Sequence, residues 1–165
     1  MSKSEQNLQQ AFAGESQANR KYLAFAKKAE QEGYSQAAKL FRAAAAAETI
    51  HAHNHLRELG AVKSTAENLQ DAINGESYEF QKMYPQMITD AKDEGNDKAL
   101  KTFSYANEVE KIHAALYKKS LAELTKTKAA SDYYVCKVCG YTAEGEAPDN
   151  CPVCKANRAA FMMAE

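Results

Sequence analysis

The sequence predicts an all-α four-helix bundle followed by a small metal-binding domain, and three observations support this fold class. Residues 1 to about 124 are rich in Ala, Glu, Gln, Lys and Leu, which favour helix, and they include a single proline. The same residues contain two copies of one helical hairpin. All four cysteines lie in the last 30 residues, where they form two Cys-x-x-Cys pairs.

Glycines and one capping motif set the expected helix boundaries. A glycine commonly follows the last turn of a helix, because it adopts the left-handed conformation without a steric penalty. Gly33, Gly60 and Gly95 stand at such places. Ser64 and Glu67 have the spacing of a capping box, which predicts that a new helix begins there. The expected helices span residues 4–32, 35–59, 65–94 and 97–124.

A polar linker over residues 125–132 separates the helical region from the cysteine-bearing tail. We therefore expect one domain over residues 1–126 and a second over residues 131–165. The net charge of −1 implies no strongly basic face, so a nucleic-acid partner is not expected. No apolar run approaches the roughly 20 residues that cross a bilayer, and the polar N-terminus lacks the apolar stretch of a secretory signal. We expect no membrane association and a cytoplasmic location.

The two hairpins form an internal repeat with a change of register. Three motifs recur in the same order: Gly-Glu-Ser at 14–16 and 75–77, Glu-Gly at 32–33 and 94–95, and Glu-x-x-His at 48–51 and 110–113. The offset is 61 residues for the first motif and 62 for the others. One extra residue has therefore entered the third helix between Glu76 and Gly95. A helix absorbs such an insertion most easily as a π-bulge, and Pro85 is a candidate for its position.

The repeat carries the side chains that a di-iron site in a helical bundle requires. Such a site takes one Glu from each of two helices and a Glu-x-x-His from each of the other two. The i, i+3 spacing places Glu and His on one helical face. Carboxylates neutralise two cations, and imidazole adds a nitrogen ligand suited to iron. The predicted ligands are Glu15, Glu48, His51, Glu76, Glu110 and His113. A lone Glu-x-x-His is more typical of a solvated helix face, but the matched repeat favours a metal.

Glu79 is an additional carboxylate with no counterpart in the first copy, where Ala18 stands. It lies three residues after Glu76, so we expect it to point at the same site. A ferric ion prefers anionic oxygen more strongly than a ferrous ion does. One iron could therefore exchange His51 for Glu79 as its charge rises.

Four aromatic or imidazole side chains near the predicted ligands have a structural alternative. Tyr22 and Tyr84 occupy equivalent positions in the two hairpins. Each side chain has two possible roles, which are packing in the core and donating a hydrogen bond to a ligand carboxylate. We expect His53 and His55 at the surface, since Tyr117 stands at the position equivalent to His55.

The four cysteines predict one tetrahedral metal site. They are Cys136, Cys139, Cys151 and Cys154. Two Cys-x-x-Cys knuckles supply four thiolates, which suit zinc or iron. Iron is favoured over zinc, because an iron site can carry single electrons and is fused here to a di-iron site that would use them. Lys155 stands where Gly140 follows the first pair, so we expect a less relaxed second turn.

On these motifs, and along nearly its full length, the chain resembles the rubrerythrin family. The first region is similar to a ferritin-like bundle. The tail is similar to a β-rich rubredoxin domain, with Cys-x-x-Cys-Gly-Tyr … Cys-Pro-x-Cys and Phe161 as a trailing core aromatic. The resemblance implies exchange of His51 against Glu79, with Tyr22 and Tyr84 beside the ligand carboxylates. The implied iron ligands are Glu15, Glu48, His51, Glu76, Glu79, Glu110 and His113 for the pair, and Cys136, Cys139, Cys151 and Cys154 for the third iron.

The resemblance also implies an activity. It is the reduction of hydrogen peroxide to water for protection against oxidative stress, with three irons per chain: one di-iron pair and one Fe(Cys)4 site. Electrons would come from NAD(P)H through a separate reductase. Three other functions remain open: ferroxidase or dioxygen reduction at the same centre, iron storage, and a zinc-bearing binding module.

The short connection between the hairpins predicts how two chains combine. In ferritin-like bundles the second and third helices run parallel, so the chain between them must travel the length of the bundle. Placing Glu48 and Glu76 at one height requires roughly 30 Å, whereas residues 60–64 span at most about 18 Å. Either the bundle is up-down-up-down, or the second hairpin packs on the first hairpin of a partner. We expect the second arrangement, a domain-swapped homodimer.

Overall fold

The computed structural model describes residues 1–126 and 130–164, and the chain divides into two compact units, Met1–Lys63 and Ser64–Glu165. The first unit holds α1 (Lys3–Gln31) and α2 (Ser35–Glu58). The second holds α3 (Thr65–Tyr78), η1 (Glu79–Met83), α4 (Tyr84–Asp93), α5 (Asp97–Glu123), β1 (Tyr133–Cys136), β2 (Thr142–Glu144), η2 (Arg158–Ala160) and β3 (Phe161–Met163). Residues 127–129 of the predicted linker lie outside the described residues. Helices followed by a small β-rich domain confirm the predicted fold class.

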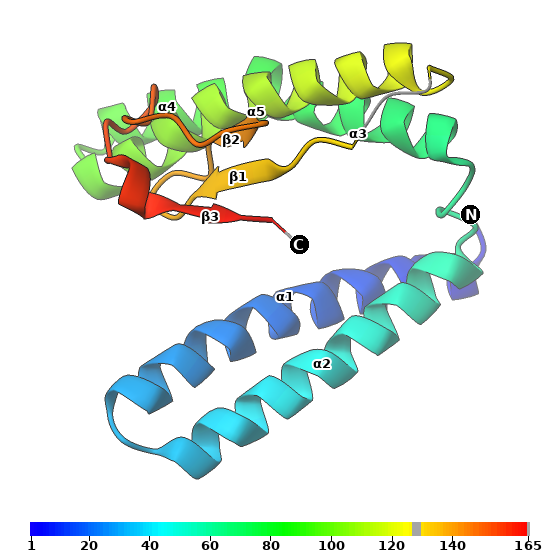
Figure 1. The fold of residues 1–165 in the computed structure, drawn as a ribbon. Helices are drawn as coiled ribbons and strands as arrows, with labels where there is room; N and C mark the ends of the chain where they lie inside the picture. The colour runs from blue at the N-terminus through cyan, green and yellow to red at the C-terminus, as the bar shows by residue number, and fades with distance from the viewer. Residues whose placement is uncertain (127–129, 165) are drawn as a thin grey trace. The chain divides into compact units, whose positions relative to one another are not determined.

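The first unit is an antiparallel helical hairpin of α1 and α2 (Figure 1). Gly33 turns the chain with a φ of 83°, as the Glu-Gly motif predicts. Small side chains, including Ala26, Ala38 and Ala45, are buried in the hairpin, so the two backbones approach closely. Buried Asn19 donates to the carbonyl of Ala45 and to the hydroxyl of Thr49 at 2.7 and 2.8 Å.

The third predicted helix is interrupted by a π-helical segment, η1, between α3 and α4. The Tyr84 amide donates to the Glu79 carbonyl five residues before it. The predicted π-bulge is therefore confirmed, and Pro85 lies two residues after its last residue, Met83. Proline has no amide proton and tolerates a break in the helical ladder. The predicted capping box of Ser64 and Glu67 is confirmed at the start of α3.

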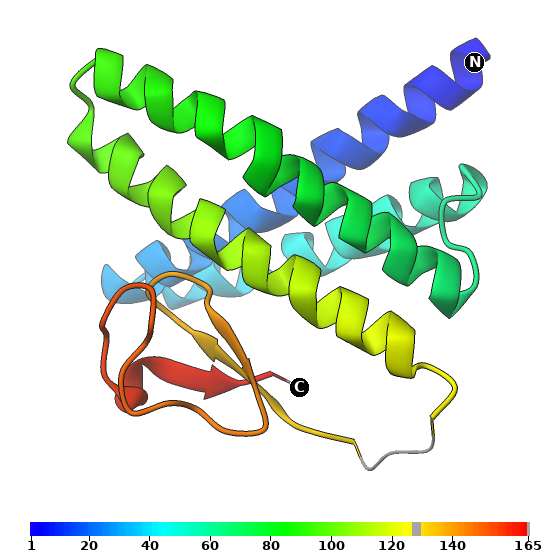
Figure 2. The same ribbon diagram turned by 90° about the horizontal axis from the view of Figure 1, so that it is seen from above.

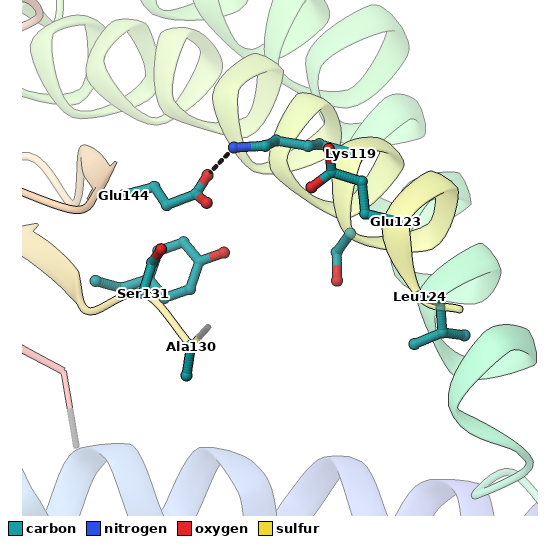
Figure 3. A pocket seen from close by; sticks show the side chains of 8 residues that line it. Lys119, Glu123, Leu124, Ala130, Ser131 and Glu144 are labelled. Carbon is teal, nitrogen blue, oxygen red and sulfur yellow. Dashed lines mark hydrogen bonds and ion pairs between the residues drawn. The ribbon is translucent and has the colours of Figure 1, made fainter. Parts of the chain in front are cut away.

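The tail forms a three-stranded antiparallel sheet in the order β2-β1-β3. Phe161 packs edge-on against Tyr141, with ring centroids 6.2 Å apart. Within the second unit this sheet lies beside α5 (Figure 2). An ion pair of Lys119 on α5 with Glu144 on β2 borders a cavity of about 430 Å³ (Figure 3). Across the described residues, no helix has the length and apolar character needed to cross a membrane.

Candidate metal centres

The first unit brings together Glu15, Glu48 and His51, which we call the N-terminal ligand group. One ligand atom of each lies within 4.8 Å of the others. The His51 Nδ1 atom is 3.0 Å from a Glu48 oxygen, as the i, i+3 spacing dictates. A hydrogen bond with Glu48 raises the pKa of Glu15, and the same hydrogen bond lowers the pKa of Glu48. Two carboxylates this close repel each other, and a bound cation would neutralise them.

The second unit brings together Glu76, Glu110 and His113, which we call the C-terminal ligand group, again within 4.8 Å of one another. The His113 Nδ1 atom is 2.7 Å from Glu110 and 3.8 Å from Glu76. Burial, and then the hydrogen bond and charge of Glu110, raise the pKa of Glu76 to about 7. Carboxylates crowded in this way favour a divalent cation, which removes their mutual repulsion.

The π-helical segment places Glu79 and Tyr84 beside the C-terminal ligand group. Burial and then the charge of Glu110 raise the pKa of Glu79. Burial and then the charges of Glu110, Glu79 and Glu76 raise the pKa of Tyr84. The change in register explains this placement. Glu76 keeps the 61-residue offset, while Tyr84 has the 62-residue offset from Tyr22, so the extra residue lies between them.

The structure shows the surroundings of Tyr22, His53 and His55, for which the sequence leaves a packing or surface role open. Tyr22 packs against Phe41 with ring centroids 6.2 Å apart, which is a core role, and its hydrogen bond to a ligand carboxylate stays a prediction. His53 is exposed, as predicted. His55 is half-buried, so part of its ring is exposed and part is covered. It shares the ligand-bearing side of α2, because it lies one turn after His51.

The four cysteine sulfurs also lie within 4.8 Å of one another. Two Sγ pairs, Cys136–Cys154 and Cys139–Cys151, are separated by 3.6 and 3.5 Å. These separations exceed the roughly 2.05 Å of a disulfide. They approach the roughly 3.8 Å between sulfurs that each lie 2.3 Å from a tetrahedral ion. The donor set therefore fits one zinc or iron ion.

Backbone amides in the knuckles point at the sulfurs. Although burial opposes it, hydrogen bonds from the amides of Val138 and Cys139 lower the pKa of Cys136. Burial raises the pKa of Cys139, which a bound cation would reverse. Lys155 has a φ of 64°, so the prediction of a strained second turn is confirmed. Its ammonium group donates to the carbonyl of Pro152 at 2.8 Å, which holds this turn.

The sequence profile described as Rubrerythrin matches residues 6–121. The chain therefore belongs to the rubrerythrin family. A second profile, described as "Rubrerythrin, rubredoxin-like domain", matches residues 134–162. The resemblance that the motifs indicate is thus confirmed for both regions of this rubrerythrin-family chain.

Characterised relatives support the assignment over most of the length. Nigerythrin of Nitratidesulfovibrio vulgaris is 41% identical, over 90% of this chain and 80% of its own. Rubrerythrin-2 of Clostridium acetobutylicum is 37% identical, over 93% and 92%. Solved structures of nigerythrin in its mixed-valence and fully reduced, all-ferrous states are 35% and 34% identical. They align over 99% of this chain and 88% of theirs, with TM-scores of 0.59 and 0.60.

Membership confirms the predicted cofactors at the level of the family. Rubrerythrin-family proteins are oxidoreductases that carry a di-iron centre and an Fe(Cys)4 site, and this chain has a donor cluster for each. The individual ligand assignments stay predictions. One contact escapes sequence reasoning entirely: Thr142 on β2 hydrogen-bonds His113 at 2.9 Å. No spacing rule connects a threonine in the tail with a histidine 29 residues earlier.

Proposed function

We propose that this chain is a di-iron peroxidase that reduces hydrogen peroxide to water and protects against oxidative stress. Its metal set would be three irons per chain, one pair and one Fe(Cys)4. The observation that carries the proposal is the presence of two matched Glu/Glu/His groups and a four-cysteine cluster in one chain. The domain limits we propose are 1–126 for the helical region and 131–165 for the tail.

Seven side chains would hold the iron pair, and four the single iron. They are Glu15, Glu48, His51, Glu76, Glu79, Glu110 and His113 for the pair, and Cys136, Cys139, Cys151 and Cys154 for the third iron. His51 is the ligand that we expect to exchange against Glu79. Bound iron supplies the electrons that reduce the O–O bond.

The protein must also supply protons, because two protons accompany the two electrons that convert peroxide to two waters. Glu79 and Tyr84 are placed for this role. Burial raises the pKa of both groups beside Glu110, which favours their protonated forms. Their position next to the ligand carboxylates would let them deliver protons to the departing oxygens.

We further propose a domain-swapped homodimer. Each di-iron centre would take Glu15, Glu48 and His51 from one chain and Glu76, Glu79, Glu110 and His113 from its partner. The proposal is supported by the location of each ligand group within its own compact unit and by the short segment between α2 and α3. Dilution should release iron as the dimer dissociates, measured by sedimentation and iron analysis. Retention of the iron pair by a monomer would exclude the swap.

Electrons would reach the pair through the Fe(Cys)4 site from an external NAD(P)H-linked rubredoxin reductase in the cytoplasm. The four-cysteine domain supports this route, because iron storage needs no cysteine-bearing tail. A zinc ion would give the tail a structural role only. The family's other oxidoreductase activity, dioxygen reduction, uses the same residues and is separated from peroxidase activity by experiment.

The deciding experiment follows the visible absorption of Fe(Cys)4 in fully reduced, anaerobic protein. We expect hydrogen peroxide to reoxidise this site at least about tenfold faster than dioxygen at equal concentration, a difference of about 1.4 kcal/mol in barrier. Faster reoxidation by dioxygen would replace the peroxidase with an oxygen reductase. Absence of the Fe(Cys)4 spectrum from protein purified with its native metals would support a zinc module instead.

A further inference from the structure

His113 is held from both sides of its ring. Its Nδ1 atom faces Glu110 at 2.7 Å and Glu76 at 3.8 Å. Its Nε2 atom lies 2.9 Å from the hydroxyl oxygen of Thr142. Thr142 belongs to the tail domain, so a side chain of the four-cysteine domain reaches a candidate ligand of the iron pair within one unit.

The Thr142 hydroxyl has a second partner, which sets the direction of its hydrogen bonds. It lies 3.2 Å from the carbonyl oxygen of Gly140, which can only accept. A hydroxyl has one proton and two lone pairs. When that proton goes to Gly140, a lone pair of Thr142 is available to the Nε2–H of His113. A neutral imidazole protonated at Nε2 has its free lone pair at Nδ1, on the side of the carboxylates.

The surroundings make Thr142 an important partner for Nε2. His113 and Thr142 line a cavity of about 360 Å³ whose walls include Leu69, Leu116 and Val135. The walls also carry the hydroxyl groups of Tyr117, Ser120 and Tyr133, but the hydroxyl that lies 2.9 Å from Nε2 is that of Thr142. An imidazole N–H without a partner is unfavourable in this mainly apolar setting. The hydroxyl of Thr142 thus keeps the ring in one orientation.

The backbone beside Thr142 lies close to the same helix. Gly140 follows Cys139 with a φ of 85°, and a Cβ placed on it would lie 3.8 Å from Val109 of α5. Val109 is buried. The carbonyl that accepts from Thr142 therefore belongs to the first cysteine knuckle, which contacts α5 one turn before His113.

We propose that Thr142 is a positioning residue that fixes His113 in the Nε2-protonated tautomer and presents Nδ1 to the metal. The inference rests on the proposed di-iron function, because it assigns His113 as a ligand. It adds that the tail domain orients this ligand directly. Partners of the second ring nitrogen commonly tune metal-bound histidines, and their loss typically lowers metal affinity about 10- to 100-fold.

The test uses the full-length protein loaded with zinc in place of iron, so that ¹⁵N NMR can observe the histidine nitrogens. In the unmodified protein we expect His113 to carry its proton on Nε2 and to exchange it with solvent at least about tenfold more slowly than the exposed His53. Exchange as fast as that of His53 would overturn the inference without any variant.

Three substitutions complete the test. Thr142→Val removes the hydroxyl at constant shape and should speed Nε2–H exchange and lower zinc affinity about 10- to 100-fold. Thr142→Ser should restore both, because it restores the hydroxyl. Thr102→Val is the matched control, since the Thr102 hydroxyl is exposed and bonds only its own helix among the described residues; it should change neither.

The two proposals fail in different ways. Unaltered tautomer and affinity in Thr142→Val, with zinc bound at Glu76, Glu110 and His113, would overturn the role of Thr142 alone. Failure of the unmodified protein to bind zinc at these residues would overturn the di-iron function. The absorption of a cobalt-loaded four-cysteine site reports whether the tail of Thr142→Val is folded. If the tail of Thr142→Val is not folded, the role of Thr142 is decided by the exchange rate of the His113 Nε2 proton in the unmodified protein and in Thr142→Ser.

Discussion

The N-terminal and C-terminal ligand groups are copies of one motif, yet only the second is elaborated. The first lies on two uninterrupted helices, and the His51 side chain is 54% exposed in the single chain. The second has a π-helical segment and the added carboxylate Glu79, and its His113 is 28% exposed and held by Thr142. One inserted residue and one docked domain thus make a symmetric ligand set unequal. We infer that His113 is the fixed histidine ligand, whereas His51 is the histidine that exchanges against Glu79.

Removing one carboxylate from each group tests whether both serve one centre. We expect Glu48→Ala and Glu110→Ala each to lower peroxide-dependent oxidation by more than about 100-fold, since loss of even an outer partner costs about 10- to 100-fold. Stopped-flow absorption and iron analysis measure this. Glu108→Ala is the control, because Glu108 is exposed on the same helix as Glu110 and pairs with Lys111. Full activity of either ligand variant would break the equivalence of the two groups.

Deleting Lys82 tests the π-helical segment, because Lys82 is exposed within η1. Without the extra residue the helix should continue as α, with Glu76 and Tyr84 seven residues apart, as Glu15 and Tyr22 are in the uninterrupted α1. Glu76 should therefore still face Glu110. We expect all three irons to remain bound, as in Lys82→Ala, measured by iron content and visible absorption. Loss of the iron pair on deletion alone would show that the π-helical turn itself, rather than the register, orients Glu76.

Much of this arrangement is predictable from sequence, because it rests on local rules and on the repeat. Gly33 and the Ser64 capping box mark helix ends by their own backbone preferences. The offset between copies locates the π-helical segment, since an insertion shifts every later match. The contact of Thr142 with His113 depends on how the tail packs against α5, and no local preference encodes that packing. The half-buried state of His55 is not predictable for a related reason. The repeat shows that Tyr117 is the equivalent residue in the second copy, but it does not show which residues surround His55.

Replacing Glu79 by alanine makes the second copy match the first, where Ala18 stands. We expect iron to remain bound, since the other six ligands of the pair are intact. The rate of peroxide reduction should fall by about 100-fold, the lower end of the range that a positioned acid contributes. Rapid mixing with peroxide measures the rate, and Gln81→Ala in the same segment is the control. Loss of the iron pair in Glu79→Ala would show that Glu79 is a permanent ligand rather than an exchangeable one.

The pH dependence of stability gives the smallest expected difference between the groups, in metal-free protein. The pKa of Glu76 is raised from 4.5 to about 7, so between these values the folded state holds a proton that the unfolded chain releases. Stability should therefore fall as the pH rises through this window, by about 1 kcal/mol for a side chain still partly exposed. Urea unfolding at pH 5 and 7.5 measures the change.

Glu76→Gln should abolish most of this pH dependence, because a neutral amide does not titrate. Glu15→Gln should change it less, since the raised pKa of Glu15 and the lowered pKa of Glu48 act in opposite directions. A larger effect of Glu15→Gln than of Glu76→Gln would reverse the comparison. It would mean that the crowded carboxylates, and with them the stronger requirement for a cation, lie in the N-terminal rather than the C-terminal ligand group.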